Sequence, residues 1–140
     1  MWLIYALLSA VAAALVAVFG KIGLKEVDAN AATAIRAVIM ALFLLGVVVV
    51  QGKASQMGEL FAQRKAIAFI GLSGVAGALS WLFYFLALQN GKVSQVGPID
   101  KLSVVIAVII AVLFLGEKIS WVNAVGVAMI AGGAILVALK

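Results

Sequence analysis

The chain has 140 residues, of which 67% are hydrophobic and 11% charged, and its mean hydropathy is +1.32. A soluble domain has about 45–50% apolar and about 25% charged residues, so this composition excludes a water-soluble protein. The sequence contains no cysteine and no histidine, which removes thiol chemistry, disulfides and the usual zinc and haem ligands. No metal or cofactor is therefore expected.

The net charge of +5 would suggest a nucleic-acid partner in a soluble protein. Here most lysines and arginines flank apolar segments, where they are typical of headgroup anchors and topology signals. No nucleic-acid binding is predicted.

Five apolar segments follow one another along the chain, and each is about as long as the roughly 20 helical residues that cross a bilayer. The first segment resembles the apolar region of a signal peptide, but it lacks a basic region before it and is expected to remain as a helix. The sequence predicts an all-α integral membrane protein, a five-helix transmembrane bundle forming one domain over residues 1–140. The expected spans are about 2–20, 31–50, 66–88, 97–115 and 119–139.

Short links between the segments predict antiparallel neighbours in an up-and-down bundle. The longest link, residues 51–65, carries Met57, Leu60 and Phe61 at helical spacing. It is interpreted either as a short helix lying along the membrane interface or as a polar loop. Both interpretations are left open.

The third segment combines small residues with an aromatic stripe. Gly74 and Gly77 have the spacing that lets helices approach closely in lipid, either within the chain or between subunits. Trp81, Tyr84 and Phe85 follow on one helical face near the middle of the segment, where an indole and a phenol need polar partners. The stripe is interpreted as packing or as the wall of a substrate cavity.

Three ionisable residues lie inside the expected spans. Asp100 and Lys101 come shortly after Pro98, which is placed in a first helical turn, where proline is tolerated. Arg36 lies about one and a half turns into the second segment. A charge within a span costs at least about 2.5–3.5 kcal/mol at mid-membrane, so each is a candidate for function.

Structural alternatives exist for these charges, because Lys101 and Arg36 can extend to the headgroups and an acid suits a helix N-terminus. Adjacent helical residues point about 100° apart, so Asp100 and Lys101 are not expected to pair with each other. Arg36 and Asp100 share a membrane level in the expected topology, which favours pairing between them. Arg36 also suits an anionic substrate, through its bidentate fork.

Positive charges are balanced across the expected topology. A protein with one orientation normally has an excess of Lys and Arg on its cytoplasmic side, whereas here each side has four. The balance favours insertion in both orientations. Side one has the N-terminus and the second and fourth links, and it carries Lys53, Arg64, Lys65 and Lys118. Side two has the first and third links and the C-terminus, and it carries Lys21, Lys25, Lys92 and Lys140.

From about Trp81 onward the sequence resembles the EamA module of the drug/metabolite transporter superfamily. The matching stretches are residues 84–88, 96–99 and 113–118, with Gly126 and the Gly132–Gly133 pair, and residues 19–21 and 34–37 fit more loosely. Most EamA transporters carry two five-helix modules, so the chain resembles the half-size members. The resemblance implies that two copies assemble around a site at the membrane midplane, and the balanced charges favour an antiparallel homodimer.

The expected function is secondary transport of a small metabolite or drug-like solute by alternating access, in the inner or plasma membrane. Asp100 would be the coupling or substrate carboxylate, Lys101 and Arg36 its electrostatic partners, and Trp81 with Tyr84 the cavity walls. The wider family has small or polar residues after the proline, so it says nothing of the roles of Asp100 and Lys101. The alternative is a non-transporting membrane subunit or scaffold of a larger complex. No enzymatic activity is expected, because no nucleophile–base set is present.

Overall fold

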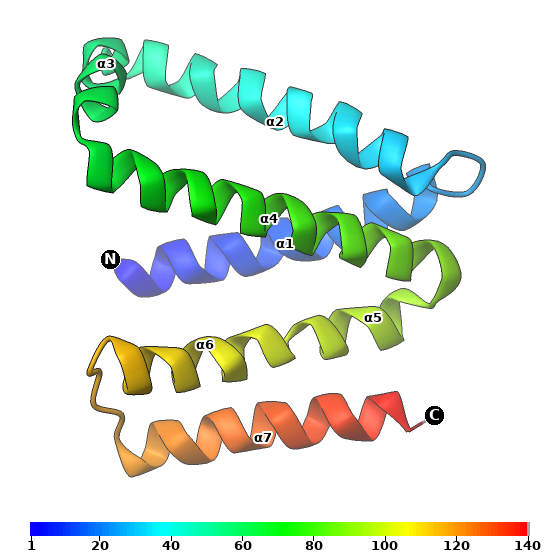
Figure 1. Ribbon diagram of the computed structural model, residues 1–140. Coiled ribbons are helices and arrows are strands. Elements are labelled where there is room, and N and C mark those ends of the chain that lie inside the picture. The colour runs from blue at the N-terminus through cyan, green and yellow to red at the C-terminus, as the bar shows by residue number, and fades with distance from the viewer. Residues whose placement is uncertain (140) are drawn as a thin grey trace. The chain divides into compact units, whose positions relative to one another are not determined.

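The computed structural model describes residues 1–139; Lys140, which entered the charge balance, lies outside the described residues. Seven α-helices make up this part of the chain, and no strand occurs in it (Figure 1). Five segments are long and apolar enough to cross a membrane, which confirms the predicted all-α fold class. They are α1 (Trp2–Gly23), α2 (Ala29–Val50), α4 (Arg64–Asn90), α5 with α6 (Val93–Phe114) and α7 (Trp121–Ala138).

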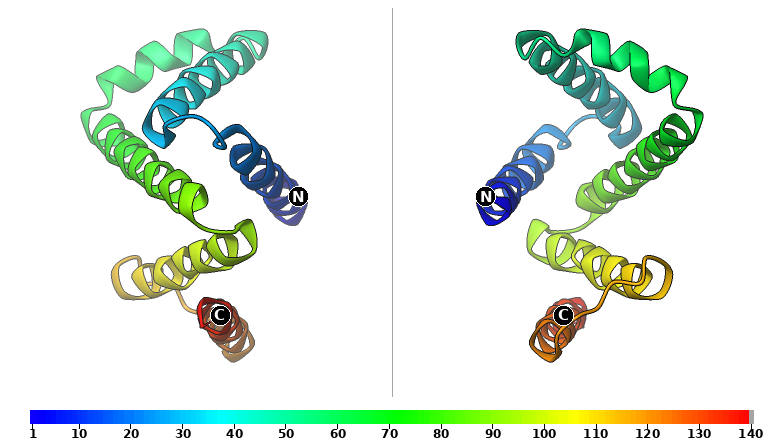
Figure 2. Two further views of the ribbon diagram at one scale, coloured as in Figure 1. Left: turned by 90° about the vertical axis from the view of Figure 1, so that its right-hand side faces the viewer. Right: turned by 90° about the vertical axis from the view of Figure 1, so that its left-hand side faces the viewer.

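The chain divides into two compact units. The first unit comprises Met1–Phe19 and Asn90–Lys140, and the second comprises Gly20–Gln89. In the first unit α7 packs against both α5 (Val93–Asp100) and α6 (Leu102–Phe114). In the second unit α2 and α4 run in opposite directions, and α3 (Ala54–Ala62) crosses from the end of one to the start of the other (Figure 2).

Local signals explain where α2 begins and ends. Asp28 is its N-cap and accepts a hydrogen bond from the N–H of Ala31 at 2.9 Å. At the other end Gly52 has φ +68°, and Lys53 N–H donates to Val48 O at 3.0 Å. This is a Schellman ending, in which glycine adopts the left-handed conformation at the lowest cost.

Residues 54–62 of the longest link form a helix, so the helical interpretation of this link holds over the polar-loop one. Its apolar face includes Leu60 and Phe61, and the phenyl side chain is 70% exposed. A short amphipathic helix with an exposed aromatic ring is suited to the membrane interface. That location stays a prediction.

The fourth span differs from the expected one at its start and in its middle. The helix begins at Val93, so Pro98 lies inside α5 and not in its first turn. The helix is interrupted at Lys101, whose N–H donates to Pro98 O at 3.1 Å and whose carbonyl accepts from Val104 N–H at 3.0 Å. These three-residue spacings are tighter than those of an α-helix, and the missing N–H of proline weakens the turn before them.

The chain buries few of its own side chains. Leu88 is the only large side chain among residues 1–139 with no exposed surface. Most apolar residues of the spans are exposed instead, as Leu42, Leu113 and Val122 illustrate at 65%, 71% and 76%. A helical surface of this kind is suited to contact with lipid or with another membrane protein.

Candidate functional site

Two hydrogen bonds from side chains to backbone carbonyls and one buried aromatic ring connect the helices of the second unit near the first link. Lys21, in the last turn of α1, donates to Leu88 O, and Gln89 Nε2 donates to Val27 O at 3.1 Å. Carbonyls in the last turn of a helix lack N–H partners within that helix, and Lys21 supplies a donor to one of them at the end of α4. Phe85 is buried beside them, at 3% exposure. The end of α4 is thereby fixed to the end of α1 and to the link that precedes α2.

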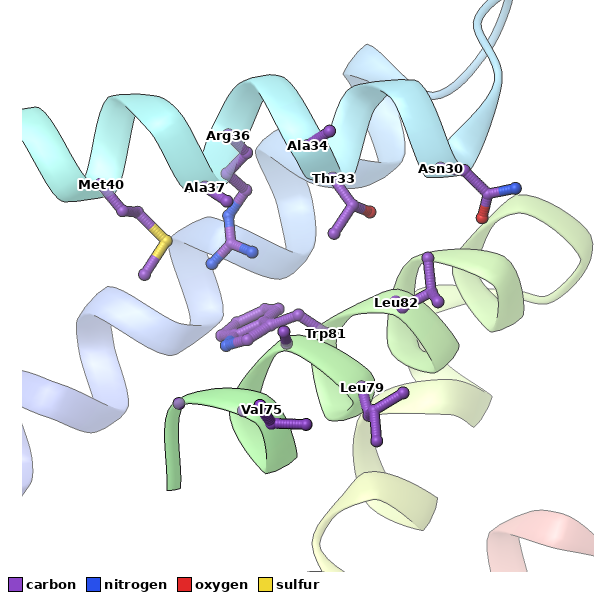
Figure 3. Close-up of a pocket in the computed structure, with 13 residues that line it drawn as sticks. Asn30, Thr33, Ala34, Arg36, Ala37, Met40, Val75, Leu79, Trp81 and Leu82 are labelled. Carbon is purple, nitrogen blue, oxygen red and sulfur yellow. The ribbon is translucent and has the colours of Figure 1, made fainter. Parts of the chain in front are cut away.

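A pocket of about 590 Å³ opens between α2 and α4, in the same unit (Figure 3). Its size is within the range of small-molecule sites, about 300–1,000 Å³. On α2 the lining residues include Asn30, Thr33, Arg36 and Met40, and on α4 they include Gly74, Val75, Gly77, Leu79, Trp81 and Leu82.

Arg36 and Trp81 bridge the two helices across this pocket. The guanidinium carbon lies 3.7 Å from the centroid of the indole ring and 5.0 Å from the centroid of the Phe85 ring. Both distances are within the roughly 6 Å at which a cation is attracted to an aromatic face. Arg36 points from α2 toward Trp81, as Figure 3 shows, and does not extend to the end of the helix.

The aromatic stripe forms a connected cluster. Trp81 meets Tyr84 edge to face, with centroids 5.6 Å apart and ring planes at 85°, and it meets Phe85 at 5.9 Å. Such pairs contribute about 0.5–1.5 kcal/mol beyond the burial of their area. The cluster orients Trp81, which lines the pocket; the predicted role of Tyr84 as a cavity wall stays a prediction.

Glycines contribute open space to the wall formed by α4. A Cβ added at Gly74 or at Gly77 would meet no atom of the described residues within 4 Å. Close packing of these glycines against another helix is therefore not seen within residues 1–139. The subunit interface that their spacing also suggested stays a prediction.

Asp100 and Lys101 lie in the other unit, where α5 gives way to α6. Lys101 Nζ is 3.1 Å from Asp100 Oδ2, and the two side chains are 56% and 32% exposed. The expectation that these neighbours do not pair with each other is therefore wrong. Neighbouring side chains point apart in this tighter turn as well, so the contact forms because the long, flexible lysine chain folds back onto the carboxylate. The predicted pairing of Arg36 with Asp100 stays a prediction.

Most of the residues that line the pocket were not predicted from the sequence, and on α2 they include Asn30, Thr33 and Met40. The signal for them was their spacing, since residues 30, 33, 37 and 40 share one face of a helix with Arg36 close by. The tether residue Gln89 had no comparable signal.

These features define a class: a multi-pass α-helical membrane protein with a pocket between two of its candidate spans. The model of the EamA-like transporter family matches residues 1–139, and the chain belongs to that family. The chain is also 44% identical, over 138 residues, to a Sinorhizobium sp protein named as an uncharacterized transporter in the cobO 3′ region. The match covers 99% of the chain and 96% of that relative. No solved structure matches.

The family match confirms the resemblance to the EamA module that the sequence motifs indicated. The chain is therefore a membrane transporter by its family membership. The relative is matched over nearly its whole length, so it too has the length of one five-helix module. Family and fold agree on a protein of several spans.

Proposed function

We propose that the chain is a secondary transporter of a small solute and that it works by alternating access as a homodimer of antiparallel copies. The observation that carries the proposal is the pocket between α2 and α4, bridged by Arg36 and Trp81. Arg36 is seven residues into α2, so it lies about 10 Å along the helix axis at 1.5 Å per residue. A cation at that depth in a transporter favours a role in solute binding or coupling.

Three features support the homodimer. Five spans put the two ends of the chain on opposite sides of the membrane, so two copies of opposite orientation form an inverted pair like the repeats of larger transporters. The Lys and Arg residues are balanced between the two sides, which favours both orientations. The spans also leave most of their apolar side chains exposed, which offers a surface to a second copy.

The interruption at Lys101 supports a coupling role for Asp100. Transporter sites are commonly built at discontinuous helices near the middle of the membrane, and Lys101 is the ninth residue of the 22-residue span. A proton that binds the Asp100 carboxylate would remove its charge and release the Lys101 ammonium from the ion pair. The charge distribution at the interruption would then change with each transport cycle.

The test is solute accumulation in proteoliposomes supplied with a small-metabolite extract, with and without a proton gradient, followed by mass spectrometry of the vesicle contents. The expected result is gradient-dependent enrichment of one class of solute, lost in Arg36→Gln and kept in Arg64→Gln. Arg64 is the first residue of α4 and is not among the residues that line the pocket, so the second variant is a matched control. Equal contents in protein-free vesicles would reject transport, and copurification with other chains would then support the membrane-subunit alternative.

A further inference from the structure

One face of the Arg36 guanidinium is covered by an aromatic ring, whereas the N–H donors along its edge have no partner among the described residues. The indole of Trp81 covers the face at 3.7 Å. Within residues 1–139 the guanidinium makes no ion pair and no hydrogen bond. The N–H groups lie in the plane of the group and form a fork that matches a carboxylate in two parallel hydrogen bonds. Stacking on Trp81 therefore fixes the plane of the fork and leaves its donors for a ligand.

The charge of the pocket favours an anion. Among the described residues that line it, Arg36 is the only one with a charged side chain. Arg36 is partly buried, and a cation held partly away from water without an opposite charge carries a cost that an aromatic face offsets only in part. A ligand with one negative charge balances the site, whereas a cationic ligand adds to the cost.

The remainder of the pocket favours an apolar body on that anion. Besides Arg36, the lining side chains with hydrogen-bonding groups are Asn30, Thr33 and the indole of Trp81, and the Thr33 hydroxyl donates to Ala29 O at 2.7 Å. Beyond Arg36 on α2 the wall includes Met40, and α4 contributes Val75 (Figure 3). A sugar or a nucleotide needs many hydrogen-bond partners, and this wall supplies few.

Gly74 and Gly77 leave space in the part of the pocket wall that α4 forms, and this space affects how large a ligand can be. A methyl group at Gly74 or Gly77 would enter free space and touch no other described residue within 4 Å. Alanine is also favoured over glycine in the interior of a helix. These positions therefore allow the pocket to be narrowed without an expected cost in stability.

We propose that this pocket binds a small monocarboxylate with an apolar body, with its carboxylate on the edge of Arg36 and its body against the wall that contains Met40, Val75 and the two glycines. The inference rests on the proposed function, because it names the class of solute that the transporter carries. Binding is nevertheless measurable without transport, so the two are tested separately.

The first experiment uses Trp81 as a reporter. The variant Trp2→Phe/Trp121→Phe leaves Trp81 as the only tryptophan, since the chain contains three. In phosphatidylcholine nanodiscs its fluorescence is titrated with 3-phenylpropanoate, 3-phenylpropanamide and 3-phenylpropylamine, which share a body and differ in charge. The same comparison is made for straight-chain acids of four to ten carbons and their amides. We expect saturable binding of carboxylates, at least tenfold weaker binding of amides and none of amines.

Substitutions in the same background assign the binding to this pocket. Arg36→Gln should weaken carboxylate binding at least tenfold, Arg36→Lys should keep part of it, and Arg64→Gln should leave it unchanged. Gly74→Ala/Gly77→Ala should reduce the longest acid that binds, whereas Gly71→Ala should not, because Gly71 is on the same helix and does not line the pocket. Equal affinity for acids and amides across the series, or a preference for amines, would overturn the proposal.

A lipid phosphate could also supply the anion, and the nanodisc composition separates the two sources. If phosphatidylglycerol abolishes carboxylate binding and by itself changes the Trp81 fluorescence, and if Arg36→Gln removes that fluorescence change, the site is a lipid site and the solute proposal fails. Carboxylate binding without any flux in proteoliposomes would reject the transport function and keep the binding site. Flux of solutes without preference for carboxylates would reject the binding proposal alone.

Discussion

The ring of Phe85 occupies the space that a side chain on Gly20 would need. A Cβ built on Gly20 would clash with the Cε1 atom of that ring, whereas a Cβ on Gly23 would meet no described atom within 4 Å. Phe85 also contacts Trp81, which carries the guanidinium of Arg36. The close approach of α1 and α4 at Gly20 is thus connected, through two rings, to the candidate binding site.

Replacing Gly20 by alanine should destabilise the protein, because Phe85 must move out of a close contact and strain of this kind costs about 1–3 kcal/mol. Thermal unfolding in detergent should show a lower Tm for Gly20→Ala than for the unchanged protein. Gly23→Ala is the matched control, since it adds the same methyl group to the same helix in open space. Equal Tm values for the two variants would show that Phe85 does not constrain Gly20.

Single cysteines should reveal the orientation of the chain, because the sequence has no cysteine of its own. Val27→Cys lies in the first link and Gln56→Cys in α3, so the two label opposite sides of the membrane. A membrane-impermeant thiol reagent applied to intact cells should label a fraction of each variant if both orientations occur. Labelling of one variant alone would establish a single orientation and exclude the antiparallel homodimer.

Extra positive charge on side one should bias the orientation. Gln51→Lys/Gln56→Lys adds two lysines to the second link, and chains orient with their excess of Lys and Arg in the cytoplasm. We expect the labelling pattern to shift to one orientation and transport to fall at least tenfold. Coexpression with a second variant biased the other way, Glu26→Lys/Val27→Lys in the first link, should restore transport only in the mixture. Full transport by one biased variant alone would contradict the antiparallel pair.

Neutralising Asp100 should uncouple transport from the proton gradient. Asp100→Asn keeps the size of the side chain and removes its charge, so the ion pair with Lys101 is lost. Gradient-driven accumulation in proteoliposomes should fall at least tenfold, while Glu59→Gln, in α3 outside the spans, should behave as the unchanged protein. Transport fully retained in Asp100→Asn would remove this residue from the coupling step.

The five spans were predictable because length and hydropathy alone decide whether a segment crosses a bilayer. The interruption at Lys101 was not, since it depends on hydrogen bonds between residues three apart around Pro98 and not on any change in composition. The pairing of Asp100 with Lys101 depends on the conformation of the lysine side chain, which no sequence pattern indicates.

Part of the pocket could be predicted from the sequence. Gly74, Gly77 and Trp81 were each noted as candidates, and their spacing of three and four residues places them on one face of α4. Which face of α2 lies opposite them depends on the length of α3 and on the tethers from Lys21 and Gln89. The stacking of Arg36 on Trp81 is a consequence of that register, and no local pattern around Arg36 signals it.

The scarcity of buried side chains makes the stability of this protein a property of its surroundings. Within residues 1–139, no span has more than 6% of its most apolar window buried. Any molecule that covers the folded helices, whether a lipid, a detergent or another copy, shifts the folding equilibrium by mass action. A Tm measured for the purified chain is therefore specific to one detergent and one protein concentration, and comparisons between variants require both to be held constant.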